Sequence, residues 1–144
     1  KMAVGKKQID GDWYYFKDWG GMYQNAFIKN GTSVCHAAAD GKLTVGWLQQ
    51  GSTYYYFDET GEQYFDRFFE YDNNTYRVNA DGKMVTGWKQ IGGVWYYMDA
   101  DGAMATGWRQ TAPGQWYYLN ANGAMAASTV IDGYTLDASG LWVS

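Results

Sequence analysis

The chain has 144 residues, a formal net charge of −4 at pH 7 and a sequence pI near 4.7. Its 11 Lys and Arg residues are scattered, which excludes the clustered positive charge that nucleic-acid binding requires. No run of 18 apolar residues occurs, so no membrane span is predicted, and the single cysteine excludes an internal disulfide.

Glycines mark a regular repeat along the chain. Seven of them, each closing one copy of an aromatic-rich pattern, follow one another at intervals of 20, 20, 21, 20, 21 and 17 residues: Gly21, Gly41, Gly61, Gly82, Gly102, Gly123 and Gly140. A fixed period of this size is the signature of a repeat array whose units pack on their neighbours. We expect a single array over 1–144, with repeats at about 5–22, 27–43, 46–63, 68–84, 87–104, 107–125 and 129–144. Because Lys1–Gly5 resembles Lys83–Gly87, we expect the chain to begin inside a repeat, as a fragment of a longer protein.

One position in each repeat, which we call the column position, is usually aromatic. Aligning the repeats on their closing glycines gives its occupants: Lys6, Phe27, Trp47, Phe68, Trp88, Trp108 and Thr129. Aromatic residues make up 19% of the chain, more than a short array needs for its core. Some of these rings are therefore expected to be exposed.

Turn dipeptides predict a β-hairpin in several repeats. In chain order they are Asp10-Gly11, Gly51-Ser52 and Gly92-Gly93. A two-residue turn of type I′ needs positive φ at both central residues, which two glycines allow. Pairing outward from these turns sets the following residues opposite each other: Lys6 and Tyr15, Trp47 and Tyr56, Trp88 and Tyr97. The hairpin over 107–119 has one extra residue, which we expect in its Pro113-Gly114 turn.

A second turn follows each hairpin, as in Asp99-Ala100-Asp101-Gly102, where the glycine is expected to be left-handed and the Asx side chains to bond to nearby backbone. A two-stranded hairpin is marginal alone in water, so the next unit must cover its apolar face. The sequence therefore predicts an all-β fold, a solenoid of stacked two-stranded β-hairpins with repeats of about 20 residues. Tyr14, Tyr55, Tyr96 and Tyr117 fall on the face opposite the column residues and are expected to pack in the core.

The motif GW(K/R)Q…WYY(M/L)(D/N)A(D/N)GAMATGW, strongest at 46–61 and 87–125, resembles the choline-binding or cell-wall-binding repeat of Gram-positive surface proteins and phage lysins. Related repeats occur in glucan-binding regions of glucosyltransferases and in clostridial toxins. The resemblance implies a left-handed hairpin superhelix that is non-catalytic, secreted and held at the bacterial cell surface by choline or phosphocholine on cell-wall teichoic acid. The remainder of such a protein is compatible with a cell-wall hydrolase.

The resemblance also implies aromatic cages for choline between consecutive hairpins. Carried onto this sequence, the first cage is Trp88, Trp95 and Tyr97 with Trp108 and Met104. The second is Trp108, Trp116 and Tyr118 with Met125, and lacks a Trp at Thr129. The third is Trp47, Tyr54 and Tyr56 with Phe68. At Phe68 itself, Arg77 is expected to lie opposite the ring and to place its charge where a choline would bind.

Two other functions remain open from the sequence: a module that binds glucan or another polysaccharide, and a structural adhesin stalk without a small ligand. No catalytic group, metal or cofactor is predicted, because the adjacent Cys35 and His36 point to opposite faces of a strand and have no third partner. The apolar segment 140–143 is expected either to cap the stack or to pair with a second chain in a homodimer.

Overall fold

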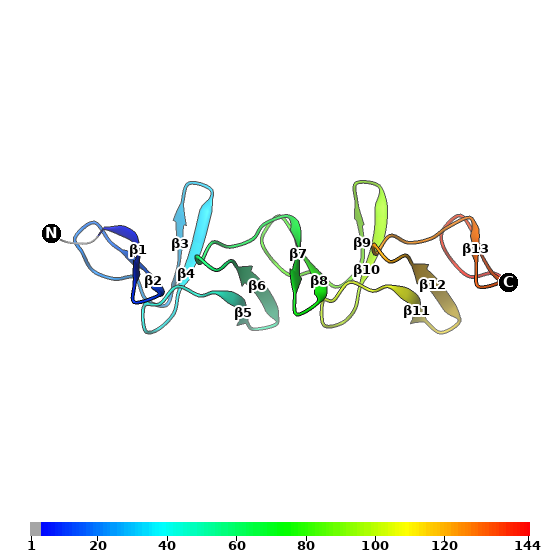
Figure 1. Cartoon of the computed structure of the whole chain (residues 1–144), viewed down its shortest axis with the longest axis horizontal. Coiled ribbons are helices and arrows are strands. Elements are labelled where there is room, and N and C mark those ends of the chain that lie inside the picture. The colour runs from blue at the N-terminus through cyan, green and yellow to red at the C-terminus, as the bar shows by residue number, and fades with distance from the viewer. Residues whose placement is uncertain (1–3) are drawn as a thin grey trace. The chain divides into compact units, whose positions relative to one another are not determined.

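The computed structural model describes residues 4–144, and over this range the chain forms 14 strands arranged as seven two-stranded hairpins (Figure 1). The predicted all-β fold of stacked hairpins is confirmed. The strands are β1 (Gly5–Ile9), β2 (Asp12–Phe16), β3 (Ala26–Asn30), β4 (Ser33–Ala37), β5 (Gly46–Gln50), β6 (Thr53–Phe57), β7 (Arg67–Tyr71), β8 (Asn74–Val78), β9 (Gly87–Ile91), β10 (Val94–Met98), β11 (Gly107–Ala112), β12 (Gln115–Leu119), β13 (Thr129–Ile131) and β14 (Tyr134–Leu136). Lys1–Ala3, on which the predicted start inside a repeat rests, lie outside the described residues. Between residues 4 and 144 there is no helix long and apolar enough to cross a membrane.

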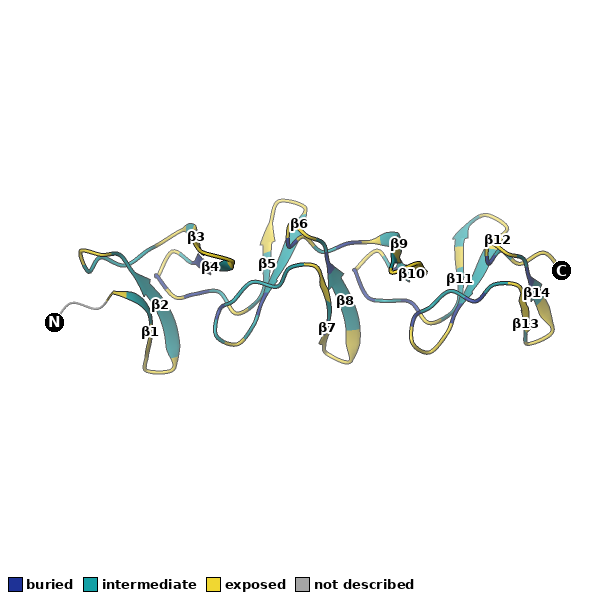
Figure 2. Cartoon of the chain, turned by 90° about the horizontal axis from the view of Figure 1, so that it is seen from above, coloured by how far each residue is buried: buried dark blue, intermediate teal, exposed yellow. Residues whose placement is uncertain are grey.

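The hairpins belong to two compact units. The first contains residues up to 67 together with 78–84, and the second contains 68–77 together with 85–144. In both units the strands are mostly half-buried, whereas the hairpin turns are exposed (Figure 2). Each strand pair therefore contributes part of a core that only its neighbours complete.

One backbone hydrogen bond recurs between consecutive hairpins. The residue that follows a hairpin and its second turn, which we call the connector residue, donates its N–H to a carbonyl in the second strand of the hairpin before. In the first unit Leu43 donates to Trp13 at 2.7 Å and Gln63 to Val34 at 2.8 Å. In the second unit Met104, Met125 and Trp142 donate to Thr75, Trp95 and Trp116 at 2.7, 2.8 and 2.9 Å.

The predicted strand registers are confirmed at three hairpins. Lys6 pairs with Tyr15, Trp47 with Tyr56 and Trp88 with Tyr97. Gly92 and Gly93 both have positive φ, 60° and 82°, as a type I′ turn requires.

The position predicted for the extra residue of the sixth hairpin is wrong. Ala112 pairs with Gln115, so Pro113 and Gly114 form a two-residue turn, and the register shifts between Gln110 and Ala112. The extra residue is Thr111, which forms a β-bulge in β11. A two-residue turn matches the twist of paired strands, and the bulge absorbs the additional residue within the ladder.

The alignment of the two terminal repeats also needs correction. Gly20, not Gly21, has the left-handed conformation, with φ 93°, and its N–H donates to the Lys17 carbonyl at 2.8 Å, as the N–H of Gly41 does to Ala38 at 2.9 Å. The corrected intervals are 21, 20, 21, 20, 21 and 17 residues.

At the other end of the chain, Thr129 pairs with Leu136 as Gly87 pairs with Met98. The column residue of the last repeat is therefore Val130 and not Thr129. The sequence alignment failed because this hairpin has strands of only three residues.

The second turns are built by Asx side chains, as predicted. Asp101 accepts a hydrogen bond from the Ala103 N–H at 2.9 Å, and Asn122 accepts one from Ala124 at 3.0 Å. The glycine of such a turn also makes room for the connector residue of the preceding repeat. A Cβ at Gly123 would lie 2.3 Å from Sδ of Met104, and one at Gly140 would lie 2.6 Å from Sδ of Met125.

The first unit has a small apolar core around the second hairpin. Ile28, Cys35, Ala37 and Leu43 form it, and Trp13, Tyr15 and Tyr23 pack against it. His36 is also buried, with its ring 4.9 Å from that of Phe27 and its Nδ1 2.8 Å from Oγ1 of Thr44. Burial lowers the pKa of His36 below its ordinary value of 6.5, so the imidazole is neutral at pH 7.

Replacing Gly123 by Ala should destabilise the protein more than replacing Gly133. Both have positive φ, 86° and 85°, but a Cβ at Gly133 meets no atom within 4 Å, whereas one at Gly123 overlaps Met104. The left-handed strain of about 1–2 kcal/mol is shared, and crowding should add roughly 1 kcal/mol at Gly123. Urea unfolding of both variants measures the difference. Equal losses would show that Met104 moves aside freely.

Acid should weaken the first unit through His36. Because its pKa is lower in the folded state, the unfolded chain binds a proton more readily. The stabilising contribution is therefore present above about pH 6.5 and is lost as pH falls through the folded-state pKa. Urea unfolding of the wild type and of His36→Gln between pH 7.5 and 5 should show a smaller dependence on pH in the variant. Identical pH profiles would contradict the assignment.

Candidate functional site

Four aromatic rings surround a cavity in the second unit. Trp108, Trp116, Tyr134 and Trp142 line a volume of about 410 Å³, which falls in the size range of small-ligand pockets. The Tyr134 ring is edge-on both to Trp108, at a centroid distance of 5.6 Å and an angle of 80°, and to Trp142, at 5.6 Å and 86°. The cavity is open to solvent, because Tyr134 is 48% exposed and Trp142 37% exposed.

Backbone pairing fixes these rings in place. Trp108 in β11 lies opposite Tyr118 in β12, whose ring supports it at 5.2 Å, and Trp116 lies two residues before Tyr118 on the same face of the hairpin. Tyr134 comes from β14 of the next hairpin. Trp142 is the connector residue that follows it, and its N–H bonds to the carbonyl of Trp116 itself.

A carboxylate contacts one of the rings that line this cavity. The indole N–H of Trp108 donates to Oδ2 of Asp132 at 3.4 Å. This weak bond orients the indole and adds a negative charge close to the electron-rich ring faces. The rings and the carboxylate together favour a cation over an anion or a neutral apolar ligand.

The same arrangement begins one repeat earlier. Trp88 contacts Trp95 at 6.3 Å and Tyr97 at 5.0 Å within its hairpin, and Tyr117 of the next hairpin at 4.8 Å. The connector residue bonded to the Trp95 carbonyl is Met125. We call the junction between two consecutive hairpins a seam. The seam that follows Trp88 therefore has the same construction, with a methionine at the connector position in place of Trp142.

In the first unit, Trp47 contacts Tyr54 at 6.3 Å and Tyr56 at 5.1 Å, and Met84 bonds to the Tyr54 carbonyl. These three rings come together as predicted. Phe68, the fourth residue predicted for this cage, belongs to the second unit, where its ring lies 5.1 Å from that of Tyr96. The cage of Trp47 with Phe68 stays a prediction.

The main chain of each predicted methionine bonds to the hairpin before its predicted cage, and the place of both side chains in the cages stays a prediction. Met104 was expected beside Trp88 and Trp95, but it bonds to Thr75 in the hairpin before them, and Met125, expected beside Trp116, bonds to Trp95. Tyr97 and Tyr118 support the column tryptophans, as the register predicts.

Sequence reasoning missed Tyr117, Tyr134 and Trp142. The tyrosines occupy the position of Tyr96 and Tyr55, which were assigned to core packing because they face away from the column residue of their own hairpin. They instead contact the column ring of the hairpin before, as Tyr55 contacts Phe27 at 5.6 Å. The sequence signal was available in the recurrence of an aromatic residue at this position.

Cationic side chains lie over rings in two repeats that have no tryptophan at the column position. The guanidinium of Arg77 lies 4.8 Å from the Phe68 ring, in agreement with the expected opposition, and Nζ of Lys6 lies 5.0 Å from the Trp13 ring. Lys6 itself occupies a column position. These seams hold a cation that belongs to the chain.

A carboxylate from the third repeat neutralises Lys6. Glu62 accepts hydrogen bonds from Lys6 at 2.9 Å, from Oγ of Ser33 at 2.5 Å and from Sγ of Cys35 at 3.1 Å. Burial tends to raise the pKa of Glu62, but these bonds outweigh burial and lower it. Burial, together with the bond to Glu62, raises the pKa of Cys35 to about 12, so its thiol remains protonated and unreactive.

Replacing Glu62 by Gln should therefore destabilise the first unit. The change removes the charge that pairs with Lys6 and weakens three hydrogen bonds, and we expect a loss of roughly 1–3 kcal/mol. The matched control is Glu59→Gln in the same turn, where the side chain is exposed and the change should stay within about 0.5 kcal/mol. Urea unfolding measures the free energy of unfolding of both variants. Equal losses would contradict the role assigned to Glu62.

Family models match most of the repeat array. Residues 85–129 match a choline-binding repeat, and residues 7–22, 45–62 and 66–84 match a cell wall binding repeat. No curated protein was matched by sequence.

Solved structures from Streptococcus pneumoniae are also similar. CbpJ from strain TIGR4 is 36% identical, and the match covers 98% of this chain and 48% of CbpJ with a TM-score of 0.89. Choline binding protein F in the presence of a peptidoglycan analogue, a tetrasaccharide-pentapeptide, is 34% identical over 100% of this chain and 48% of that protein, with a TM-score of 0.88. The chain thus spans about half the length of these relatives. The repeat matches and these similarities together establish that the chain belongs to the choline-binding, or cell-wall-binding, repeat family.

Proposed function

We propose that this chain is a non-catalytic module that binds choline groups of the cell wall in aromatic cages between consecutive hairpins. The observation that carries the proposal is the cavity lined by Trp108, Trp116, Tyr134 and Trp142. The seam of Trp88, Trp95 and Tyr117 is the second proposed site, and the rings of Trp47, Tyr54 and Tyr56 contribute to a third.

The chemistry of the cavity suits a quaternary ammonium group. Such a group has no N–H, so hydrogen bonds cannot recognise it, and the negative faces of aromatic rings are the physical alternative. Each contact contributes roughly 0.5–1 kcal/mol when exposed and about 2 kcal/mol when desolvated. Several rings then account for binding at about −4 kcal/mol, which corresponds to a dissociation constant near 1 mM.

Repetition converts weak sites into firm attachment. When two sites on one array meet a polymer that bears many cholines, the second capture is intramolecular, and avidity rises by roughly 10²–10⁴. The teichoic acid of a cell wall is such a polymer. We therefore propose a secreted protein that is held at the bacterial cell surface and released by free choline.

Two observations support this function over catalysis. Cys35, the chain's single thiol, is held protonated, and Glu62 is occupied by Lys6, Ser33 and Cys35, so neither is available as a nucleophile or a general base. Structures of the related choline binding protein F include one in the presence of a peptidoglycan analogue and one in complex with ipratropium. Hydrolytic activity against the cell wall, where present, would belong to sequence beyond this module.

Substituting Trp108 by Ala should weaken choline binding at its cage by 10-fold or more, because the ring lines the cavity and contacts Tyr134. Tyr134→Ala and Trp142→Ala should act on the same site. Calorimetric titration with choline, and retention on a tertiary-amine resin followed by release with free choline, measure the effect. Trp19→Ala serves as the matched control, since Trp19 lies in a second turn and not at a column position.

The outcomes separate the cage proposed here from the one predicted by alignment. If Tyr134→Ala and Trp142→Ala leave choline binding unchanged while Met125→Ala abolishes binding at the Trp108 site, the assignment of the connector residue is wrong. If none of these variants differs from Trp19→Ala, the aromatic cavity is not a choline site.

A further inference from the structure

Trp19 departs from the pattern of its repeat. Its equivalents in the second turns of the other repeats are small and polar: Asp40, Thr60, Asp81, Asp101, Asn122 and Ser139. Asp40, Asp101 and Asn122 each accept a hydrogen bond from the backbone N–H two residues further on. An indole has no acceptor oxygen, so Trp19 cannot support the turn in this way. Folding of the repeat does not explain this tryptophan.

Gly21 is matched to Trp19. The equivalent positions hold Lys42, Glu62, Lys83, Ala103, Ala124 and Leu141, all of which have a Cβ. A Cβ on Gly21 would lie 2.0 Å from Cη2 of Trp19, so the indole lies directly on the backbone at this glycine. The φ of Gly21 is not positive, so the backbone does not require a glycine there. Together the two residues place the indole flat against the backbone of Gly21. Trp19 remains 68% exposed there.

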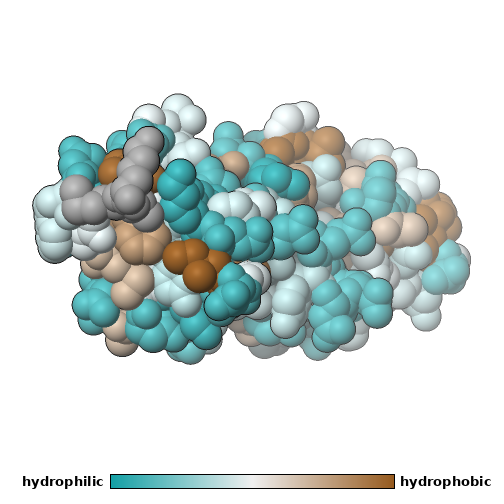
Figure 3. Space-filling model, turned by 60° about the vertical axis from the view of Figure 1, so that its left-hand side comes forward, coloured by the Kyte–Doolittle hydropathy of each residue, from teal (hydrophilic) through white to brown (hydrophobic). Residues whose placement is uncertain are grey.

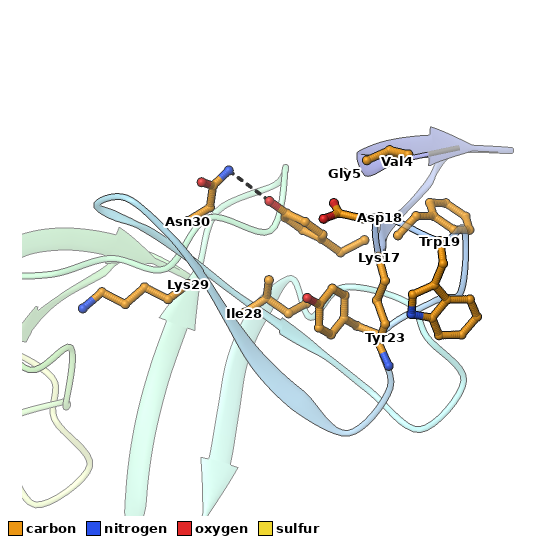
Figure 4. A pocket seen from close by; sticks show the side chains of 11 residues that line it. Val4, Gly5, Lys17, Asp18, Trp19, Tyr23, Ile28, Lys29 and Asn30 are labelled. Carbon is orange, nitrogen blue, oxygen red and sulfur yellow. Dashed lines mark hydrogen bonds between the residues drawn. The ribbon is translucent and has the colours of Figure 1, made fainter. Parts of the chain in front are cut away.

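A polar cavity of about 570 Å³ adjoins this indole (Figure 4). Trp19, Tyr23, Asp18 and Asn30 are among its lining residues, and the Asn30 amide donates to the Tyr15 hydroxyl at 3.0 Å. This leaves the Asn30 oxygen, its second amide hydrogen and the Asp18 carboxylate as polar groups of the cavity lining. The face shown in Figure 3 carries hydrophobic residues only as small separate patches on a largely hydrophilic surface. The cavity thus combines an exposed aromatic ring with several hydrogen-bonding groups.

The charge at this position argues against a further choline site. Nζ of Lys17 lies 5.4 Å from the Trp19 ring and 5.2 Å from the Tyr23 ring. A quaternary ammonium approaching Trp19 would meet this positive charge. A neutral ligand rich in hydroxyl groups would not, and its oxygens could accept hydrogen bonds from the same ammonium.

We infer that Trp19 and the adjoining cavity bind a pyranose unit of a glycan chain. The C–H face of a sugar ring stacks on the exposed indole. Its hydroxyl groups donate to Asp18 and the Asn30 oxygen and accept from Lys17. This site is separate from the choline cages and does not depend on the function proposed for them.

Calorimetric titration of the full chain, with its cages saturated by choline, tests the inference. The two ligands are a soluble peptidoglycan tetrasaccharide and an isomaltooligosaccharide, which present pyranose rings from two different sources. We expect millimolar binding of at least one. Binding of the first alone identifies the amino-sugar strand of the wall, binding of the second alone identifies a glucan, and binding of both identifies the shared ring.

The decisive variant is Trp19→Asp, which restores the residue found at Asp40 and Asp101 and should therefore preserve the turn. We expect saccharide binding to weaken at least 10-fold while choline binding is unchanged, which also verifies folding. The matched control, Trp108→Ala, should lose choline binding at its cage and keep saccharide binding. In the wild type, the indole N–H signal of Trp19 should shift on adding saccharide. Absence of binding to both saccharides, or equal binding by Trp19→Asp, would overturn the inference.

Discussion

The backbone hydrogen bond from each connector residue to the preceding hairpin is the interaction on which the structure depends. A two-stranded ribbon has unpaired groups along its edges and too little apolar surface to fold alone. The bond from Trp142 to the Trp116 carbonyl satisfies one edge group and also sets the distance between consecutive ribbons. Because the spacing is fixed by main chain, the aromatic rings at the seam need not fill it completely. A cavity of ligand size can then persist between Trp108 and Tyr134.

Sequence reasoning predicted the parts of the fold that are local. The registers around Gly92-Gly93 and the Asx turns followed from two or three residues each, since turn chemistry fixes them directly. The contacts between consecutive hairpins were harder to predict. Which residues meet there depends on the path of the connection from one hairpin to the next, and no short motif fixes that path. Met104 and Met125 were consequently assigned to the seam one repeat after the one to which their main chain bonds. Gly20 and Val130 were missed for a related reason: the Gly20-Gly21 pair and the shortened last hairpin leave two alignments equally plausible on sequence alone.

The repeats diverge in what occupies their seams. At Trp108 the rings surround open space, whereas at Trp13 the ammonium of Lys6 lies over a ring and is neutralised by Glu62. Arg77 plays the corresponding part over Phe68. The same attraction between a cation and an aromatic face thus acts within single hairpins at Lys6 and Arg77, and we propose that it binds an external cation at Trp108.

Each proposed cage draws its rings from two successive repeats, since Trp108 and Trp116 meet Tyr134 and Trp142 only through the hairpin that follows. A single repeat therefore does not contain a complete cage. Duplication or loss of one repeat during evolution changes the valence of the array by a single site, and the altered site is a hybrid whose two halves come from different ancestors. Under the proposed function, the strength of attachment to the cell wall can in this way be adjusted stepwise, without altering a tryptophan.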